Sequence, residues 1–394
     1  MFNSTQLSDK TLEYSKEITT ALLGVDRLYR LESGDEEGLV VVDMSAGEFQ
    51  PEIFADYDEA RQRWKKLRTL AEGLPEADRR KYYDQLCHST LAFIEWRQNG
   101  LPFTEQLSSF LHVPAAPASD DQLDELCRQM RDLLNQMGYS GDLVTQFTAW
   151  ENRTRVPADE VPDVLREMLN QAWDRTETRL HIPAEKSDGM KVCLVSGKAF
   201  NARCDYLRRT IELNTDPILT RSGLKHLIVH EAYPGHYVQF KLRETWYREG
   251  TAPADGLLSV VNTASSSTFE GIADNGMILL DWIKTDDDRL QSLLNRYRSG
   301  IGTGAAWRLH ALGWSIEQTT DWLRERALTG GEGWVAGRMR FLSAPARAVL
   351  IWSYWWGEAV VTPAYLNVSH DRRPDFLRYL YGRMHSNETV GMFI

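Results

Sequence analysis

The sequence predicts a mainly α-helical protein, built as a large helical domain with one small β-sheet. Nearly all of its long periodic segments repeat their apolar residues with the period of a helix and not with the alternation of a strand. Glycine and proline together mark clear breaks between these segments. With 394 residues, of which 42% are hydrophobic, the chain can bury a large core, so one large domain or two closely packed ones are expected.

The first half of the chain is expected to be helical. The predicted helices span residues 5–23, 55–73, 75–98, 123–137, 141–154 and 158–179. Gly-Leu-Pro at 73–75 and Asn-Gly-Leu-Pro at 99–102 separate the early helices, and the proline- and alanine-rich residues 114–120 form the most linker-like stretch. We predict an N-terminal helical region over residues 1–185 that covers a deep cleft, and a metal-binding catalytic region over residues 186–394. The two could also form one continuous domain.

Strand character is confined to the stretch between residues 190 and 216. Residues 192–195 and 206–213 are expected to form two short strands, joined by a loop that contains Gly197 and Lys198. This small sheet would immediately precede the candidate metal-binding helix in the sequence.

An apolar stretch over residues 224–239 contains two histidines and a glutamate, His230, Glu231 and His236. In zinc hydrolases, two histidines one helical turn apart bind the metal, and the glutamate between them acts on the attacking water. Here the histidines are six residues apart, which is about 240° around a helix, so an unbroken helix would point them to different sides.

Pro234 and Gly235 resolve this spacing. Proline lacks an N–H donor and clashes with the carbonyl four residues back, so the helix must kink, bulge or restart between the two histidines. We therefore predict that His230 and His236 bind a metal ion. His226, one turn before His230, is the alternative second ligand, and ordinary hydrogen-bonded imidazoles are the non-functional interpretation.

A zinc site with two imidazoles requires a third protein ligand and an open position for water. Glu270 and Asp274 lie four residues apart in a predicted helix, hence on one face. One carboxylate can bind the metal while the other accepts the free N–H of a ligand imidazole and fixes its orientation. An exposed acidic helix face is the alternative, but the apolar neighbours of both residues indicate a buried helix.

These stretches resemble the signature of the family known as domain of unknown function 885, whose members are similar to zinc metallopeptidases. The matching segments are His230-Glu231-Ala232-Tyr233-Pro234-Gly235-His236, Phe269-Glu270-Gly271, His310-Ala311-Leu312-Gly313-Trp314-Ser315, Arg340-Phe341-Leu342-Ser343-Ala344-Pro345-Ala346-Arg347-Ala348 and Tyr354-Trp355-Trp356-Gly357. The spacing of Glu270 and Asp274 is also similar to the second ligand helix of thermolysin-like enzymes, the gluzincins. The resemblance covers roughly residues 205–360.

The resemblance implies a zinc (Zn2+) site made by His230, His236 and Glu270, with Asp274 supporting an imidazole. It also implies roles for Tyr354 and His310 as hydrogen-bond donors to a developing oxyanion. A structural role, in an aromatic core or as a helix hydrogen-bonder, is the alternative for each of these two residues.

Arg340 and Arg347 are the expected anchors for a substrate carboxylate, because a guanidinium binds a carboxylate through two parallel hydrogen bonds. Structural salt bridges are the alternative. The chain departs from the family pattern at Tyr237, Ile272 and residues 346–347, and these departures affect the substrate side more than the presumed ligands.

The expected function is a zinc-dependent hydrolase, a peptidase that acts on short peptides. Zinc lowers the pKa of its bound water, and Glu231 is the candidate general base that accepts the water's proton. One alternative is a metalloenzyme that is not a peptidase and acts on an amino-acid-like metabolite in a biosynthetic pathway. Another is a helical binding protein without activity, which the joint presence of the ligands and Glu231 disfavours.

Composition restricts the partners. The net charge of −11 disfavours nucleic acid and anionic membrane surfaces, which bind clustered lysine and arginine. The first ten residues lack the features of a signal peptide, and no apolar run reaches membrane-spanning length. Four scattered cysteines without a C-x-x-C pair indicate reduced thiols, so we expect a cytoplasmic protein.

Overall fold

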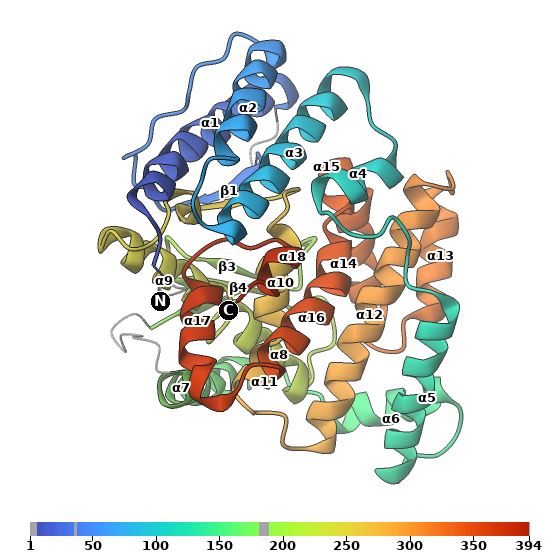
Figure 1. The fold of residues 1–394 in the computed structure, drawn as a ribbon. Coiled ribbons are helices and arrows are strands. Elements are labelled where there is room, and N and C mark those ends of the chain that lie inside the picture. The colour runs from blue at the N-terminus through green and yellow to red at the C-terminus, as the bar shows by residue number, and fades with distance from the viewer. Residues whose placement is uncertain (1–5, 35–37, 181–188, 394) are drawn as a thin grey trace. The chain divides into compact units, whose positions relative to one another are not determined.

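The computed structural model describes residues 6–34, 38–180 and 189–393, and it confirms the mainly α-helical fold with small sheets (Figure 1). The chain divides into two compact units. Unit 1 comprises Met1–Ala115, Gln239–Gly271 and Trp356–Ile394, and unit 2 comprises Ala116–Val238 and Ile272–Trp355.

The division points differ from the boundary predicted between residues 185 and 186. One of them lies between Ala115 and Ala116, within the proline-rich stretch that the sequence shows to be linker-like. The other three fall inside helices, α9 (His236–Arg248), α10 (Ser266–Asp274) and α16 (Ile351–Leu366). The amino-acid composition does not change at these three division points, because one continuous helix can bury different segments in different cores.

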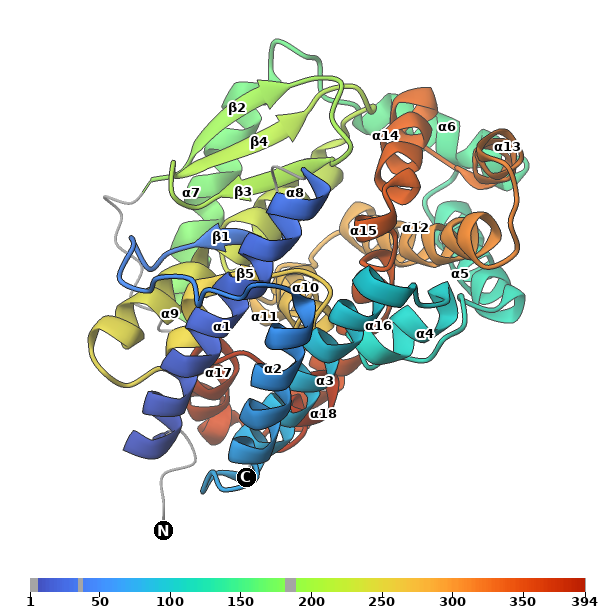
Figure 2. The same cartoon turned by 90° about the horizontal axis from the view of Figure 1, so that it is seen from above.

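Unit 1 is built around three long helices that lie side by side in both ribbon views (Figures 1 and 2). Ser8 and Asp56 cap the first two, each accepting a hydrogen bond from a backbone N–H three residues on. The elements wholly within this unit are α1 (Asp9–Ser33), β1 (Val40–Asp43), α2 (Tyr57–Ala71), α3 (Ala77–Asn99), α4 (Phe103–Phe110), η2 (Ala254–Leu257), β5 (Leu258–Val260), η3 (His370–Arg372), α17 (Arg373–Tyr381) and α18 (Asn387–Val390). Strands β1 and β5 pair antiparallel.

A buried ion cluster joins α3 to the chain that follows α17. The carboxylate of Asp78 accepts hydrogen bonds from Arg79 Nε at 2.9 Å and from Arg383 Nη1 at 3.2 Å, and Arg79 Nη1 donates to the carbonyl of Met384 at 2.9 Å. Burial raises the pKa of Asp78, but the two guanidinium groups outweigh it and lower the pKa to about 2. Asp78 is therefore a carboxylate throughout the neutral range.

Two glycines of unit 1 allow α10 and α16 to approach closely. A Cβ atom on Gly357 would lie 2.0 Å from the Ser267 carbonyl oxygen, and one on Gly271 would lie 2.4 Å from the carbonyl carbon of Gly357. Because real Cβ atoms do not come this near, both positions require glycine. This contact fixes the part of α10 that carries Glu270.

Unit 2 combines a helical layer with the larger sheet. The long helix α12 contacts α5, α8, α13 and α14, and the sheet contacts α8 through β3 (Figure 2). The elements wholly within this unit are α5 (Asp120–Gln136), α6 (Leu143–Thr154), α7 (Val161–Leu180), β2 (Lys191–Val195), β3 (Ala202–Asp205), β4 (Thr210–Asn214), α8 (Arg221–Glu231), α11 (Gly276–Leu279), α12 (Asp286–His310), α13 (Ile316–Arg326), α14 (Gly331–Ser343) and α15 (Pro345–Ala348).

The small sheet has three strands and not two. β4 is central, pairs parallel with β2 and antiparallel with β3, and lies immediately before α8 as expected. The strand predicted over residues 206–213 was wrong at its start, because residues 206–209 form a turn with Arg209 at a φ of 52°. The expected loop contains β3, whose sequence Ala-Arg-Cys-Asp shows no alternating apolar pattern.

The predicted helices of the first half all have counterparts. Residues 55–73, 75–98, 123–137, 141–154 and 158–179 correspond to α2, α3, α5, α6 and α7. The helix predicted over residues 5–23 continues to Ser33 as α1, and residue 5 lies outside the described residues. Helix α4 was not predicted, since eight residues are too few to show a clear period.

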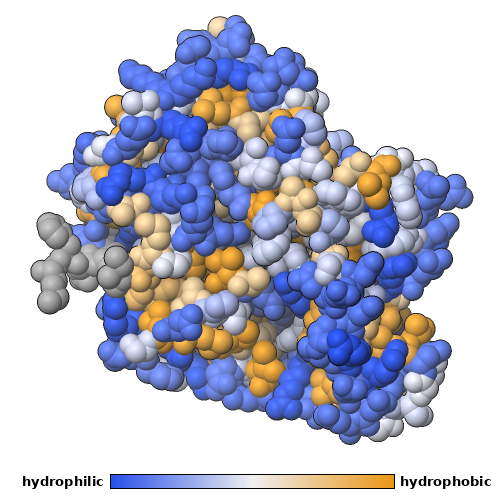
Figure 3. Space-filling view, turned by 45° about the vertical axis from the view of Figure 1, so that its right-hand side comes forward, coloured by the Kyte–Doolittle hydropathy of each residue, from blue (hydrophilic) through white to orange (hydrophobic). Residues whose placement is uncertain are grey.

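The molecular surface in Figure 3 is mostly hydrophilic, and its hydrophobic residues gather in several separate groups. Such a mixture is ordinary for protein surfaces. Among the helices that the structure describes, none combines the length and the apolar character needed to cross a membrane.

Substituting Asp78 by asparagine should lower the free energy of unfolding at pH 7 by about 3 kcal/mol, because it leaves buried arginines without their carboxylate. The depressed pKa means that Asp78 stabilises the fold above about pH 4 and loses this contribution, about 2 kcal/mol, as the pH falls to about 2. Urea unfolding between pH 7 and about pH 2 measures both effects.

Asp84→Asn is the matched control, because Asp84 pairs with Arg68 at the surface and should contribute less than about 1 kcal/mol. If Asp78→Asn behaved like this control, the cluster would not stabilise unit 1.

Candidate metal centre

A break in the helix separates the two histidines, as the sequence predicted. Helix α8 ends at Glu231 and α9 begins at His236. Pro234 has no N–H to continue the helical pattern, and the N–H of Gly235 donates to the carbonyl of Val229 at 3.0 Å. The chain thus leaves α8 and starts a new helix at the second histidine after only four residues.

This break between the helices requires glycine at position 235. A Cβ atom at this position would lie 1.7 Å from the carbonyl oxygen of His230 and 2.5 Å from that of Val229. The surroundings are backbone atoms, which cannot move aside as the end of a flexible side chain would. Any residue other than glycine at position 235 would therefore collide with the backbone of His230.

Aromatic rings pack around the residues of this break. The Tyr233 ring meets Trp173 of α7 edge-on at 5.1 Å and Tyr237 of α9 at 5.6 Å, and Tyr237 lies 5.5 Å from Tyr206. These rings pack with the geometries that aromatic pairs prefer. Tyr237, one of the departures from the family pattern, is thus a buried part of this cluster.

His230 is buried and oriented by a carboxylate of α10. Its Nδ1 lies 2.8 Å from Oδ1 of Asp274, so Nδ1–H donates to the carboxylate and the lone pair is placed on Nε2. A carboxylate that fixes the tautomer of an imidazole in this way is typical of metal-binding histidines.

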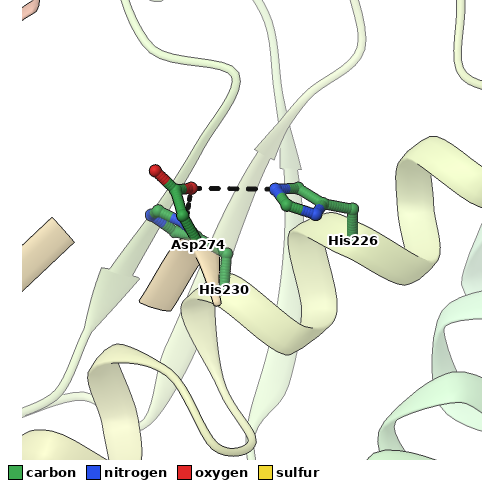
Figure 4. Close-up of side chains that lie close together, drawn as sticks. All are labelled: His226, His230 and Asp274. Carbon is green, nitrogen blue, oxygen red and sulfur yellow. Dashed lines mark hydrogen bonds and ion pairs between the residues drawn. The ribbon is translucent and has the colours of Figure 1, made fainter. Parts of the chain in front are cut away.

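A second histidine approaches the same carboxylate. His226 Nε2 lies 3.7 Å from Oδ1 of Asp274, and Figure 4 shows the carboxylate between the two imidazoles of α8. Burial raises the pKa of Asp274, but His230 and His226 outweigh this effect and hold the pKa well below its usual range. Ligand atoms of His226, His230 and Asp274 lie within 4.8 Å of one another, so the alternative ligand set is also geometrically possible.

His236 and Tyr354 flank His230. The rings of His230 and His236 are perpendicular, with centroids 4.6 Å apart, and a ring nitrogen of each lies within 4.8 Å of the other. The Tyr354 ring of α16 stacks on His230 at 6.4 Å and 30°. The structure therefore brings together four residues predicted for the site, Tyr354, His230, His236 and Asp274.

Glu231 is buried at the end of α8, 5% exposed. Its charge acts on the thiol of Cys204 in β3, whose pKa is raised mainly by burial and further by Glu231. Both residues lie in unit 2, where α8 contacts β3. The neighbouring thiol was not expected, because β3 was not recognised as a strand.

Glu270 lies in α10 one turn before Asp274. The two residues belong to different units, since the division of the chain falls between Gly271 and Ile272. Within one continuous helix, residues four apart lie on the same face.

The other predicted site residues have structural contacts. His310, near the end of α12, lies with Nε2 2.7 Å from the carbonyl of Leu342, an arrangement that links α12 to α14. Arg340 donates to the carbonyl of Lys198 at 2.9 Å and pairs with Asp216 at 3.7 Å. Arg347 lies in the short helix α15 and is half-buried.

Arg338 of α14 is a neighbour of Tyr354 that the sequence analysis missed. The two side chains are near enough for Tyr354 to act electrostatically on the guanidinium. In the sequence, the one signal for Arg338 was its position. It lies four residues after Trp334 and three residues before Phe341, on a helix with an apolar face. Such a position is usually filled by an apolar residue.

No protein-family model matches this chain, and no curated protein matches it. Two solved structures share its fold. One, from Colwellia psychrerythraea, is described as a "putative lipoprotein"; it is 13% identical, with a TM-score of 0.55 over 85% of this chain and 68% of its own. The other, from Shewanella oneidensis, is described as a "putative lipoprotein of unknown function"; it is 11% identical, with a TM-score of 0.51 over 85% and 72%. At these identities the likeness shows the fold alone.

Replacing Gly235 by alanine should destabilise the protein by about 3 kcal/mol or more, because the new methyl group collides with the backbone of His230. The affinity for zinc should fall as well, because the two histidines can no longer keep their positions. Thermal unfolding and zinc titration test this.

Gly337→Ala is a suitable control. Gly337 lies within α14, and a Cβ there would meet the Lys198 carbonyl at 3.6 Å and Arg340 Nη2 at 4.0 Å, both ordinary contacts, so alanine should be neutral or slightly stabilising. Equal behaviour of the two variants would refute the steric argument for Gly235.

Proposed function

We propose that the protein is a zinc-dependent hydrolase that acts as a peptidase on short peptides. Its metal ligands would be His230, His236 and Glu270. One observation carries the proposal: buried His230 donates Nδ1–H to Asp274 and stands beside His236 across a helix break. We also propose a distant relation to the family of domain of unknown function 885, which the signature residues at this break support.

The donor set fits zinc. Two imidazoles and one carboxylate are a common set for catalytic zinc, and such sites leave a position open for water. With Nδ1 engaged by Asp274, His230 offers Nε2, and the low pKa of Asp274 keeps that carboxylate ionised as an acceptor. Because Asp274 reaches the imidazole from α10, the carboxylate one turn earlier on the same face, Glu270, is the natural third ligand.

The same reasoning ranks the alternative set of His226, His230 and Asp274 second. In that set, Asp274 would have to act as ligand and also hold Nδ1 of His230. In our proposal, Asp274 is not a ligand of this zinc ion. Its carboxylate orients the imidazoles of His230 and His226, the two histidines of α8.

The residues of the chain would then each perform one part of the reaction. A bound zinc ion would polarise the scissile carbonyl and acidify the attacking water. Glu231, next to His230 but at the end of α8, would accept the proton of the water and pass it to the leaving group. The phenol of Tyr354, which stacks on His230, would donate a hydrogen bond to the oxyanion.

A second candidate is a metal-dependent enzyme that acts on an amino-acid-like metabolite and not on a peptide. Residues 346 and 347 motivate it, because they depart from the family pattern in the short helix α15 that lies between α14 and α16 in the sequence. Hydrolysis assays with short peptides and with N-acyl amino acids separate the two candidates.

We infer that the protein is cytoplasmic, with small molecules as partners and not nucleic acid or membrane. Its four cysteines are unpaired thiols, and Cys193 is exposed, where an oxidising compartment would leave it reactive. Cell fractionation tests this inference, and recovery of the native protein in the membrane fraction would overturn it.

Alanine at His230, His236 or Glu270 should remove stoichiometric zinc, whereas Asp274→Ala should weaken binding by about 10–100-fold because it only orients a ligand. Metal analysis of the purified, folded variants and zinc titration measure these effects. His226→Ala should keep stoichiometric zinc. Loss of zinc from His226→Ala but not from His236→Ala would instead favour the alternative set.

Glu231→Gln should keep zinc and lose most turnover, by about 10²–10⁴-fold, because the amide preserves the shape but cannot accept a proton. Steady-state hydrolysis of short peptides, with zinc content measured on the same sample, is the test. A variant that retains more than about a tenth of the rate would place the general base elsewhere. Simultaneous loss of zinc would make Glu231 a ligand.

A further inference from the structure

His226 and Asp274 face each other beside the proposed zinc ligands, and His226 has no part in the reaction proposed above. Nε2 of His226 lies 3.7 Å from Oδ1 of Asp274, and Figure 4 shows this nitrogen directed at that oxygen. Each of the two side chains is 16% exposed, so water can reach them. Both residues belong to unit 2, one on α8 and the other at the end of α10.

The separation of these two atoms suits a shared cation. At 3.7 Å it is longer than a hydrogen bond between N–H and oxygen, which measures about 2.7–3.2 Å. It is too short for a bridging water, because two hydrogen bonds of about 2.9 Å would close the angle at the water to about 80°. Zinc bonds of about 2.1 Å to both atoms give an angle of about 125° at the metal, an opened tetrahedral arrangement.

The carboxylate of Asp274 can serve both the imidazole of His230 and a cation. Its two oxygens together offer about four lone-pair positions, and Nδ1–H of His230 occupies one of them at 2.8 Å. Imidazole nitrogen and carboxylate oxygen are both common ligands of zinc. The double use of Asp274, which ranks the alternative ligand set second, makes a cation at this position weaker than the zinc ion bound by three protein ligands.

We propose that His226 and Asp274 bind a second, weaker zinc ion, completed by water, and that this ion inhibits the enzyme. Binding of the second ion is independent of the hydrolase function proposed above, whereas inhibition rests on it. A cation on Asp274 draws electron density from the carboxylate that orients His230, and its charge repels the zinc ion on the other side of that imidazole. The enzyme would therefore lose activity when zinc is in excess.

Calorimetric titration of the full-length protein with zinc chloride counts the ions and measures their affinities. The wild-type protein should bind one zinc ion tightly and a second one more weakly. His226→Gln keeps an N–H that can reach Asp274 but loses the imidazole ligand. It should keep the tight ion and weaken the second by more than about 100-fold, beyond the range of about 10–100-fold that is usual for a residue that only orients a ligand.

Hydrolysis of short peptides measures the inhibition. Saturating the second site should lower the wild-type rate by about 10-fold, because the orientation of His230 by Asp274 is weakened. The same excess of zinc should leave the rate of His226→Gln within about twofold of the rate of that variant without excess zinc. A second ion that binds without lowering the wild-type rate would refute the inhibition.

Two further variants control the result. His88→Gln is the matched control, because His88 belongs to another close pair of imidazoles, in unit 1, with its ring 5.4 Å from that of His112. This variant should keep the second ion. Asp274→Asn should lose the second ion, and it provides a second readout if His226→Gln does not fold, which circular dichroism reveals.

The proposal is overturned if excess zinc adds no second ion to the wild-type protein, or if His226→Gln keeps that ion. Loss of the tight ion from His226→Gln would also overturn it, because His226 would then belong to the first site. Failure of the hydrolase function is seen separately, as absence of the tight ion or of hydrolysis in the wild-type protein. His236→Ala, which lacks a ligand of the first site, should still bind the weaker ion when zinc is in excess.

Discussion

The candidate site depends on one steric constraint, the close approach of residue 235 to the backbone of His230. Because glycine has no side chain, the chain can leave α8 and start α9 within four residues. The break brings together two imidazoles whose six-residue spacing would point them to different sides of a straight helix. The hydrogen bond to Asp274 and the aromatic packing of Tyr233 and Tyr237 then hold a geometry that the backbone has already set.

The buried charged groups of the two units differ in how they are paired. In unit 1, Asp78 meets Arg79 and Arg383, so the cluster is satisfied internally and serves the fold. In unit 2, Asp274 is shared by two histidines, and among the residues that the structure describes no carboxylate pairs with Arg338, whose Nε is buried without a hydrogen-bond partner. An imbalance of this kind is typical of sites that complete their interactions with a ligand.

Local rules predicted a large part of this arrangement. Proline at 234 excludes a continuous helix, and the four-residue spacing of Glu270 and Asp274 places both on one face, so the break and the direction of Asp274 follow from short-range geometry. Strand β3 was missed because Ala-Arg-Cys-Asp has no alternation, and it is a strand only because β4 lies beside it. Arg338 was missed although Trp334 and Phe341 are its neighbours along α14, because only the tertiary structure brings Tyr354 near it.

The path of the chain through its two units has a consequence for folding. Unit 1 takes its segments from the beginning, the middle and the end of the chain, and three of the four crossings occur inside helices α9, α10 and α16. A ribosome therefore completes unit 2 before unit 1, and the first 115 residues must wait for the last 39. Contacts of such long sequence separation slow folding. Neither unit corresponds to a contiguous polypeptide, so truncation at any single position removes part of unit 1.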